Sequence, residues 1–387
     1  MSASDVQVTP ESTAEGTVAE EQRISADSHM GEPPDLWEKR LPAEFKDRAL
    51  RFPRVKLYET GHHLRAGGWD PDERLKDLAL DAISAEVLYP SEAKRAWVTG
   101  DPGLEEACVR VYNDWIIDFC RVAPHRFWGL AMISCWNIDH AVSELERCIK
   151  AGLHGATIPA APADEIPYSW DHYEKFWGAA QALGTPLSLH INTGPNWPTP
   201  GVRQDKPRSG LLPDSVHTFD CMKALGDLVS SGVLERYPDL KFVVAETGVG
   251  WIPFFAQEFD FHMGKNWKLP LTASEYLLRQ VYATFVSDRV GGFLLSAYGK
   301  DNFMWSNDYP HPNCIWPDST AFIARDLGRL SREDRASVIC LTVARLYNGG
   351  ELPPPADPPG EHQEIDERWS RRGLSRTPQA LERRIRG

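Results

Sequence analysis

Acidic and histidine side chains stand at the ends of several short apolar runs in this chain. Asp27 and His29 lie two residues apart in one run, and His190, Glu246 and Asp308 each belong to another. Residues two apart on a β-strand project to the same face. Carboxylates and imidazoles held at the ends of buried strands are ligands that a divalent metal ion takes. The pattern therefore predicts a metalloenzyme.

A structural alternative exists for each of these residues taken alone, because a single histidine in an apolar run more often fills the core than binds a metal. The set is harder to explain by packing. Charged groups buried at the ends of apolar strands cost several kcal/mol each unless they are compensated. A bound cation supplies that compensation, so the metal hypothesis accounts for all five residues together.

Eight short apolar runs alternate with segments in which apolar residues recur every three or four positions. Nearly continuous apolar runs are typical of parallel strands buried on both faces, and the alternation favours strand–helix units. Eight units predict an α/β fold, the (β/α)8 TIM barrel, whose active sites form at the C-terminal ends of the strands. The predicted strands are 23–30, 85–90, 127–134, 154–160, 186–193, 240–247, 281–286 and 303–309, and the predicted helices are 73–84, 103–122, 139–151, 171–183, 214–234, 252–263, 291–298 and 331–348.

Composition divides the chain into a barrel and two extensions. Residues 1–22 contain few large apolar side chains and are predicted to form a disordered leader. Residues 23–350 are predicted to form the metal-dependent barrel. Residues 351–387 are first rich in proline and then in arginine, and this extension either contacts a neighbouring subunit or is solvated.

Charge and cysteine content exclude several classes of partner. A formal net charge of −13 argues against nucleic acid, which calls for a basic surface, so a small-molecule substrate is expected. The seven cysteines are odd in number and lack a Cys-x-x-Cys pair, which indicates a reducing compartment. No apolar run approaches the ~20 residues of a membrane span. Because no Lys or Arg precedes Arg23, the basic region of a signal peptide is missing and a cytoplasmic location is predicted.

The motifs as a set resemble a known family. They are 27–29 (DSH), 32–37 (EPPDLW), 188–190 (SLH), 245–251 (AETGVGW), 306–311 (SNDYPH) and 344–347 (ARLY). Together they resemble the amidohydrolase superfamily, in the branch of aminocarboxymuconate semialdehyde decarboxylase and the resorcylate decarboxylases. The resemblance implies a homodimer or larger homo-oligomer and a metal held by four residues: Asp27, His29, His190 and Asp308.

Two departures from these decarboxylases concern the end of the sixth predicted strand. Glu246 stands where the relatives usually carry a substrate-binding histidine, and the segment 254–262 lacks the arginine that helps to hold a substrate carboxylate. A missing cation and an added anion disfavour a substrate carboxylate on this side. Three roles for Glu246 stay open: metal ligand, general base, or hydrogen-bond partner of a ligand histidine.

Further candidates follow from position along the chain. His311 lies three residues after Asp308 and is predicted to act in catalysis or as an additional ligand. His262 is a second additional ligand candidate, although a helix of about ten residues would carry it roughly 15 Å from the helix start. The candidate substrate contacts are Trp37, Trp197 and His217.

The leading hypothesis is a metal-dependent enzyme that activates water for hydrolysis, or for a related C–C lyase reaction such as decarboxylation, of a small organic substrate. The metal lowers the pKa of bound water from about 15.7 toward 7, and Asp308 or Glu246 accepts the proton. The alternative is a non-haem iron oxygenase, with Glu246 completing a two-iron centre. Zinc, manganese and iron all accept these ligands, with one or two ions per chain. A catalytically inactive barrel is the third alternative.

Overall fold

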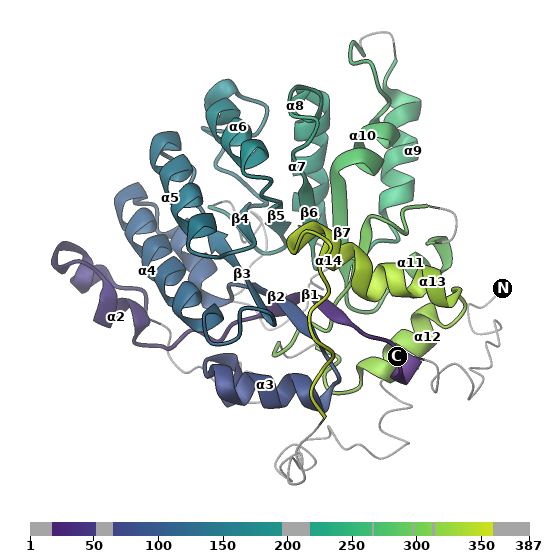
Figure 1. The fold of residues 1–387 in the computed structure, drawn as a ribbon. Coiled ribbons are helices and arrows are strands. Elements are labelled where there is room, and N and C mark those ends of the chain that lie inside the picture. The colour runs from purple at the N-terminus through teal and green to yellow at the C-terminus, as the bar shows by residue number, and fades with distance from the viewer. Residues whose placement is uncertain are drawn as a thin grey trace, which may run out of the picture.

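The computed structural model describes residues 18–51, 65–195, 217–264, 267–295, 298–311 and 314–358. Eight parallel strands lie side by side in chain order (Figure 1). Almost every strand residue is buried, because parallel strands in this architecture are covered on both faces. The strands are β1 (Ile24–His29), β2 (Ala85–Tyr89), β3 (Phe127–Met132), β4 (Gly155–Pro159), β5 (Leu187–His190), β6 (Phe242–Ala245), β7 (Val281–Phe285) and β8 (Phe303–Trp305).

The sheet curves into a nearly closed (β/α)8 barrel, which confirms the predicted fold class. Its seam joins β1 to the segment that follows β8. There the N–H of Asp308 donates to the carbonyl of Asp27 (3.1 Å), and the N–H of His29 donates to the carbonyl of Tyr309 (2.6 Å). The backbone bonds of the seam therefore involve three of the predicted ligands.

Helices form the outer layer of the barrel (Figure 1). In the part of the chain described here, none combines the length and the apolar character of a membrane span. The α-helices are α2 (Leu36–Arg40), α3 (Pro71–Leu80), α4 (Pro102–Cys120), α5 (Ile138–Lys150), α6 (Glu174–Ala182), α7 (Thr218–Ser230), α8 (Val233–Arg236), α9 (Ile252–His262), α10 (Ala273–Gln280), α11 (Arg289–Leu294), α12 (Ser319–Leu327), α13 (Arg332–Ala336) and α14 (Thr342–Tyr347). Tighter turns form η1 (Ala43–Arg48), η4 (Ala66–Gly68), η5 (Glu92–Val98) and η6 (Asp171–Tyr173), and η8 (Ser337–Leu341) is a π-helical segment.

The first described residues correct the predicted boundary of the leader. Val18 is fully buried, and the Glu21 carboxylate accepts two hydrogen bonds from the Arg335 guanidinium, at 2.6 and 2.7 Å. Residues 18–22 therefore pack onto the barrel, and the predicted leader extends too far. The composition of 1–22 concealed this because few side chains of residues 18–22 make the contacts, namely Val18, Glu21 and Gln22, whose Nε2 donates to the carbonyl of Pro353 (2.7 Å).

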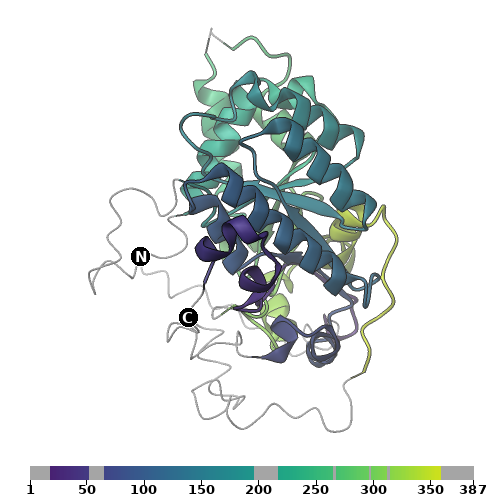
Figure 2. The ribbon, with the colours of Figure 1, turned by 90° about the vertical axis from the view of Figure 1, so that its left-hand side faces the viewer.

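The segment after the last helix lies along the outside of the barrel (Figure 2). Arg126 donates to the carbonyls of Pro354 (3.2 Å) and Pro355 (3.0 Å), which holds this proline-rich stretch near the start of β3. The arginine-rich part of the extension lies outside the described residues. All seven cysteines are buried and none forms a disulfide.

Candidate metal centre

Five of the predicted residues come together at the C-terminal ends of the strands. Asp27 and His29 belong to β1, His190 is the last residue of β5, Glu246 follows β6, and Asp308 lies three residues beyond β8. Their potential ligand atoms form two overlapping groups that share one histidine, with all atoms of a group within 4.8 Å of one another. One group consists of Asp27, His29 and His190. The other consists of His29, Glu246, Asp308 and His311.

The shortest distances join the two imidazoles to each other and to the carboxylates. His29 Nε2 lies 3.1 Å from His190 Nε2, 3.4 Å from Asp27 Oδ1 and 3.5 Å from Asp308 Oδ1. His190 Nε2 lies 3.4 Å from Glu246 Oε2, which is 4.0 Å from His29 Nε2. The atoms therefore surround one small volume at the mouth of the barrel.

The contact made by the outer nitrogen of each imidazole leaves the inner nitrogen available to a metal ion. His29 Nδ1 lies 3.2 Å from the carbonyl of Pro90, and His190 Nδ1 lies 2.7 Å from the carbonyl of Ile191. Because a carbonyl only accepts, we assign the proton to Nδ1, which leaves a lone pair on each Nε2. Two facing lone pairs repel unless a cation lies between them, and two ligand nitrogens of one ion are about 3 Å apart. Asp27 Oδ1 is buried and accepts no hydrogen bond within the described ranges. These residues fit a divalent metal ion.

Burial and mutual charge perturb the titration of this cluster. Burial lowers the pKa of His29 well below its usual value. Burial also lowers the pKa of His190, but the nearby carboxylate of Asp27 outweighs it and the pKa is raised. Burial, together with the negative charge of Asp308, raises the pKa of Glu246 well above the usual range. The carboxylates thus crowd negative charge into one site, which a divalent cation would stabilise.

Two of the carboxylate residues adopt a backbone conformation that is uncommon outside glycine. Glu246 and Asp308 both have a φ of 58°, in the left-handed region. Such residues persist where the surrounding structure determines their conformation, and they concentrate at functional sites. Here the N–H of Glu246 donates to Thr284 Oγ1 (2.8 Å) and the N–H of Asp308 donates to the carbonyl of Asp27 (3.1 Å). The backbone that carries both side chains is therefore fixed by hydrogen bonds.

Neutral polar side chains orient the candidate ligands and their segments through hydrogen bonds. The hydroxyl of Thr284, on β7, donates to Asp27 Oδ2 (2.9 Å) and accepts from the N–H of Glu246. Asn307 Oδ1 accepts from the hydroxyls of Ser25 (3.0 Å) and Ser28 (3.2 Å) and so links β1 to the segment after β8. Such outer partners fix the orientation of metal ligands. Sequence reasoning missed Thr284, since threonine in an apolar strand carries no signal of its own.

His311 joins the centre, as the sequence analysis expected. Its Nδ1 lies 2.8 Å from Asp308 Oδ1, its Nε2 lies 3.2 Å from Ser91 Oγ, and its ring stacks on His29 with centroids 3.6 Å apart. Both ring nitrogens are engaged in these contacts. The geometry therefore favours His311 as a residue that orients Asp308 and exchanges protons over one that binds the metal directly.

The turn η5 brings a cation to the mouth of the barrel. The Glu32 carboxylate accepts hydrogen bonds from the N–H groups of Ser91 (2.9 Å) and Glu92 (3.0 Å), which fixes the start of η5. Lys94 follows in this turn, is half-buried, and acts electrostatically on both ligand imidazoles and on the carboxylate after β6. The cation that is missing after the sixth strand therefore has a counterpart in Lys94, which follows the second strand and is not marked by any motif.

Two candidates from the sequence lie elsewhere. His262 is 70% exposed at the end of α9, with Nε2 3.6 Å from Glu258 Oε2, so the expectation that it binds the metal is corrected. The helix directs it away from the mouth, as its distance from the helix start indicated. Trp37 is fully buried and its Nε1 donates to the carbonyl of Cys108 (3.1 Å), which makes it part of the packing between α2 and α4.

The two remaining substrate candidates adjoin or occupy the segment 196–216. His217 is buried at the start of α7, with Nδ1 4.0 Å from Asp220 Oδ2. Trp197 lies outside the described residues. The structure therefore assigns neither of them to the metal centre.

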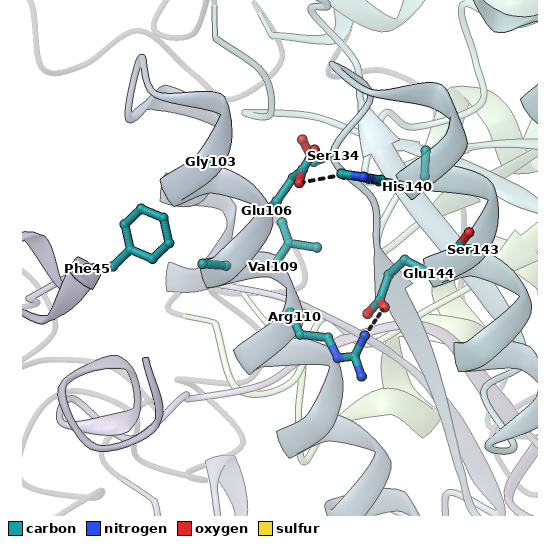
Figure 3. Close-up of a pocket in the computed structure, with 11 residues that line it drawn as sticks. Phe45, Gly103, Glu106, Val109, Arg110, Ser134, His140, Ser143 and Glu144 are labelled. Atoms are coloured by element: carbon teal, nitrogen blue, oxygen red, sulfur yellow. Dashed lines mark hydrogen bonds and ion pairs between the residues drawn. The ribbon is translucent and has the colours of Figure 1, made fainter. Parts of the chain in front are cut away.

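A groove of about 530 Å³ lies between α4 and α5 on the outside of the barrel (Figure 3). His140 Nδ1 lies 2.9 Å from Glu106 Oε2, and Arg110 donates to Glu144 at 3.0 Å, so ion pairs line its walls. None of the candidate ligands lines this groove. It is therefore separate from the metal centre.

Comparison with known families shows to which family this chain belongs. The family model described as amidohydrolase matches residues 58–349 of the 387. The chain belongs to the amidohydrolase family. This agrees with the resemblance that the sequence motifs suggested, and the match covers β2 to β8 with the helices between them.

Relatives of this amidohydrolase are named as decarboxylases. It is 27% identical over 277 residues to the gamma-resorcylate decarboxylase of a Polaromonas species, covering 66% of this chain and 82% of that one. It is 25% identical over 256 residues to the 2-amino-3-carboxymuconate-6-semialdehyde decarboxylase of Dictyostelium discoideum, covering 63% and 67%. A solved dihydroxybenzoic acid decarboxylase from Polaromonas, with bound manganese and an inhibitor, shares the fold with a TM-score of 0.63 at 19% identity, covering 86% of this chain and 98% of that one.

Proposed function

We propose that this amidohydrolase is a metal-dependent lyase that removes the carboxyl group of a small aromatic or conjugated acid. The convergence of Asp27, His29, His190 and Asp308 on one volume is the observation that carries the proposal. The same centre would serve hydrolysis, the first reaction considered from the sequence. The names of the relatives favour decarboxylation.

The ion would be held by those four residues, whose mixture of oxygen and nitrogen donors suits manganese, iron or zinc. A bound divalent ion supplies Lewis acidity that stabilises negative charge on substrate oxygens. Manganese is our first candidate, because it occupies the solved decarboxylase with the same fold. The protein contributes the fixed positions of the ligands through Thr284 and the outer hydrogen bonds of the imidazoles.

A carboxylate substrate requires a cation near the centre, and Lys94 fills that role in our proposal. It lies on η5, half-buried beside an acidic cluster that would otherwise repel an anion. An ammonium group is a compact charge suited to a carboxylate. In our proposal Lys94 takes the place of the arginine that the segment 254–262 lacks, which answers the missing-cation part of the objection raised from the sequence and leaves the added anion Glu246 to the proton-transfer step.

Decarboxylation also requires a proton. The bond between the ring carbon and the carboxylate breaks, CO₂ leaves, and the electron pair left on carbon takes a proton. Glu246 and His311 are the residues of the centre with the most exposed side chains, at 17% and 15%, so they border the space that a substrate enters. We assign the proton transfer to one of this pair, with His311 paired to the Asp308 carboxylate.

A second candidate function follows from Glu246. This carboxylate completes a group of four potential ligands with His29, Asp308 and His311, beside the group that contains Asp27. The two groups share His29, whose one available nitrogen serves a single ion, so a second ion would be held by Glu246 and Asp308, and two irons in such a carboxylate-rich site would suit oxygen chemistry. On this alternative the enzyme hydroxylates a small apolar substrate with one oxygen atom of O₂, and the other atom is reduced to water by two electrons from an external donor and two protons.

Metal analysis of protein purified without oxygen, combined with two assays, separates the candidates. Samples loaded with Mn²⁺, Zn²⁺ or Fe²⁺ would be given a panel of hydroxybenzoic acids while CO₂ release and O₂ uptake are recorded. One ion per chain with CO₂ release and no O₂ uptake supports the lyase. Two irons per chain with O₂ uptake supports the oxygenase. Failure to retain any divalent ion would reject both.

A further inference from the structure

A buried ion pair connects the main chain of two metal-ligand segments. Arg74 of α3 and Glu86 of β2 are both fully buried, and the guanidinium donates to both carboxylate oxygens, from Nε at 2.6 Å and from Nη2 at 2.8 Å. Burying two charges is costly unless the geometry is good and every donor is used. A pair at this position therefore calls for an explanation beyond stability.

The remaining donors of Arg74 go to backbone carbonyls. Nη1 donates to His29 (2.8 Å) and to Gly67 (3.2 Å), and Nη2 donates to Tyr309 (3.4 Å). With the bonds to Glu86, every N–H of the guanidinium has an acceptor. The planar guanidinium group thus fixes the relative positions of four segments of the chain.

Two of these carbonyls belong to the metal centre. His29 is itself a ligand, and Tyr309 directly follows the ligand Asp308 and accepts the N–H of His29 at 2.6 Å. The guanidinium also lies over the Tyr309 ring, 4.6 Å from its centroid. Arg74 therefore binds on both sides of the seam between β1 and the segment after β8, where His29 Nε2 and Asp308 Oδ1 stand 3.5 Å apart.

We propose that the Arg74–Glu86 ion pair is the positioning element of the metal centre, setting the separation of the ligands His29 and Asp308 through their main chain. The inference rests on the proposed metal-dependent function. It predicts that Arg74 acts on metal affinity without touching the metal. A lysine at position 74 would keep the positive charge. Its single ammonium group could not bind the carbonyls of His29 and Tyr309 and the carboxylate of Glu86 at the same time.

The test compares Arg74→Lys with a matched control at a second buried arginine pair. Arg335 donates to both oxygens of Glu21 and to the carbonyl of Leu330 (3.1 Å), and it touches no candidate ligand. Both substitutions remove one bidentate pair. We expect Arg74→Lys to raise the dissociation constant for Mn²⁺ by about 10- to 100-fold, the usual cost of losing an outer partner. Arg335→Lys should lower the melting temperature of the metal-free protein comparably and leave the affinity for Mn²⁺ unchanged.

The readouts are Mn²⁺ binding by equilibrium dialysis and the electron paramagnetic resonance spectrum of bound Mn²⁺, neither of which depends on turnover. Glu86→Gln, which keeps every donor of Arg74, should weaken Mn²⁺ less than Arg74→Lys and serves if the latter fails to fold. The inference would be overturned if the folded Arg74 or Glu86 variant bound Mn²⁺ within twofold of the parent's affinity. It would also be overturned if Arg335→Lys lost as much Mn²⁺ affinity as Arg74→Lys. Either result would leave the proposed function standing. A parent protein that binds no Mn²⁺, Fe²⁺ or Zn²⁺ would overturn the proposed function as well.

Discussion

The candidate ligands of this amidohydrolase stand out in the sequence by residue type, whereas the residues that position them do not. A charged side chain at the end of an apolar run is conspicuous in a sequence, so Asp27, His190 and Asp308 were identified directly. Thr284 and Arg74 act through hydrogen bonds to residues far away in the chain. Nothing local distinguishes them, because their role exists only once the barrel has closed.

Substituting His190 tests whether the two imidazoles share one ion. We expect His190→Ala to leave a folded barrel and to remove metal and activity together, because a ligand Nε2 3.1 Å from His29 Nε2 is lost. Metal content and circular dichroism provide the measurement. His262→Ala is the matched control, since this exposed histidine lies outside the centre. Normal metal content in His190→Ala would reject the ligand assignment.

Glu246→Gln separates the three roles of this carboxylate. If Glu246 binds a second ion, the variant should lose that ion first, because Asp27, His29 and His190 remain. If it is only a general acid or base, metal content should persist while turnover falls by about a hundredfold. Metal stoichiometry measured beside turnover distinguishes these outcomes. A variant with unchanged metal stoichiometry and unchanged turnover would show that Glu246 has only a structural role.

Lys94 is predicted to act on substrate binding. Lys94→Met should raise KM for the carboxylate substrate by about 10- to 100-fold, because losing one charge-assisted partner of a buried anion costs a few kcal/mol at most. Lys94→Arg, which restores the charge, should recover part of the loss. Lys300→Met, at an exposed lysine paired with Asp334, is the control. Equal KM values in Lys94→Met and the parent would exclude the assigned role.

Among the elements, the strands were predicted more accurately than the helices around them. Each strand is a short buried run, so its position follows from composition alone. The predicted helix 331–348 is instead α13, a π-helical segment and α14. The extra residue of a π-turn leaves the spacing of apolar residues nearly unchanged over so short a stretch, which hides it from a periodicity argument. The short helix α10 was missed altogether, as its eight residues span barely two turns.

The helix α4 carries a buried carboxyl group that should make stability depend on pH. Glu105 is buried and accepts from Trp136 Nε1 (3.1 Å), and burial raises its pKa to about 7. The folded chain therefore binds this proton more tightly than the unfolded chain. Its stabilisation is fully present below about pH 4.5 and is lost as the pH rises through about 7, by about 3 kcal/mol in total.

Unfolding by urea at pH 5, 6, 7 and 8 checks this dependence. We expect the free energy of unfolding of Glu105→Gln to fall less steeply with pH than that of the parent, because the titrating group is gone. Glu146→Gln, at an exposed position of α5, is the control and should follow the parent. Parallel profiles for the parent and Glu105→Gln would contradict the prediction.

At the scale of the whole molecule, three neighbouring helices expose large apolar side chains. Phe219 on α7, Phe254 on α9, and Val290 and Phe293 on α11 are each more than 60% exposed. The helices adjoin one another: Gly226 of α7 faces Phe259 of α9, and Gly250, just before α9, faces Val290. We define these four exposed residues as the apolar face. Exposed apolar patches on soluble proteins commonly mark association sites.

We predict that two copies of the chain associate through this apolar face. A second copy is the partner that fits, because apolar contact allows two molecules of net charge −13 to meet without pairing opposite charges. Sedimentation analysis at micromolar concentration should give the mass of a dimer, and Phe254→Glu combined with Phe293→Glu should halve it, since buried unpaired charges oppose association. Trp170→Glu, at an exposed tryptophan outside this face, is the control and should remain dimeric. A monomeric parent, or a double variant that stays dimeric, would place the association elsewhere or exclude it.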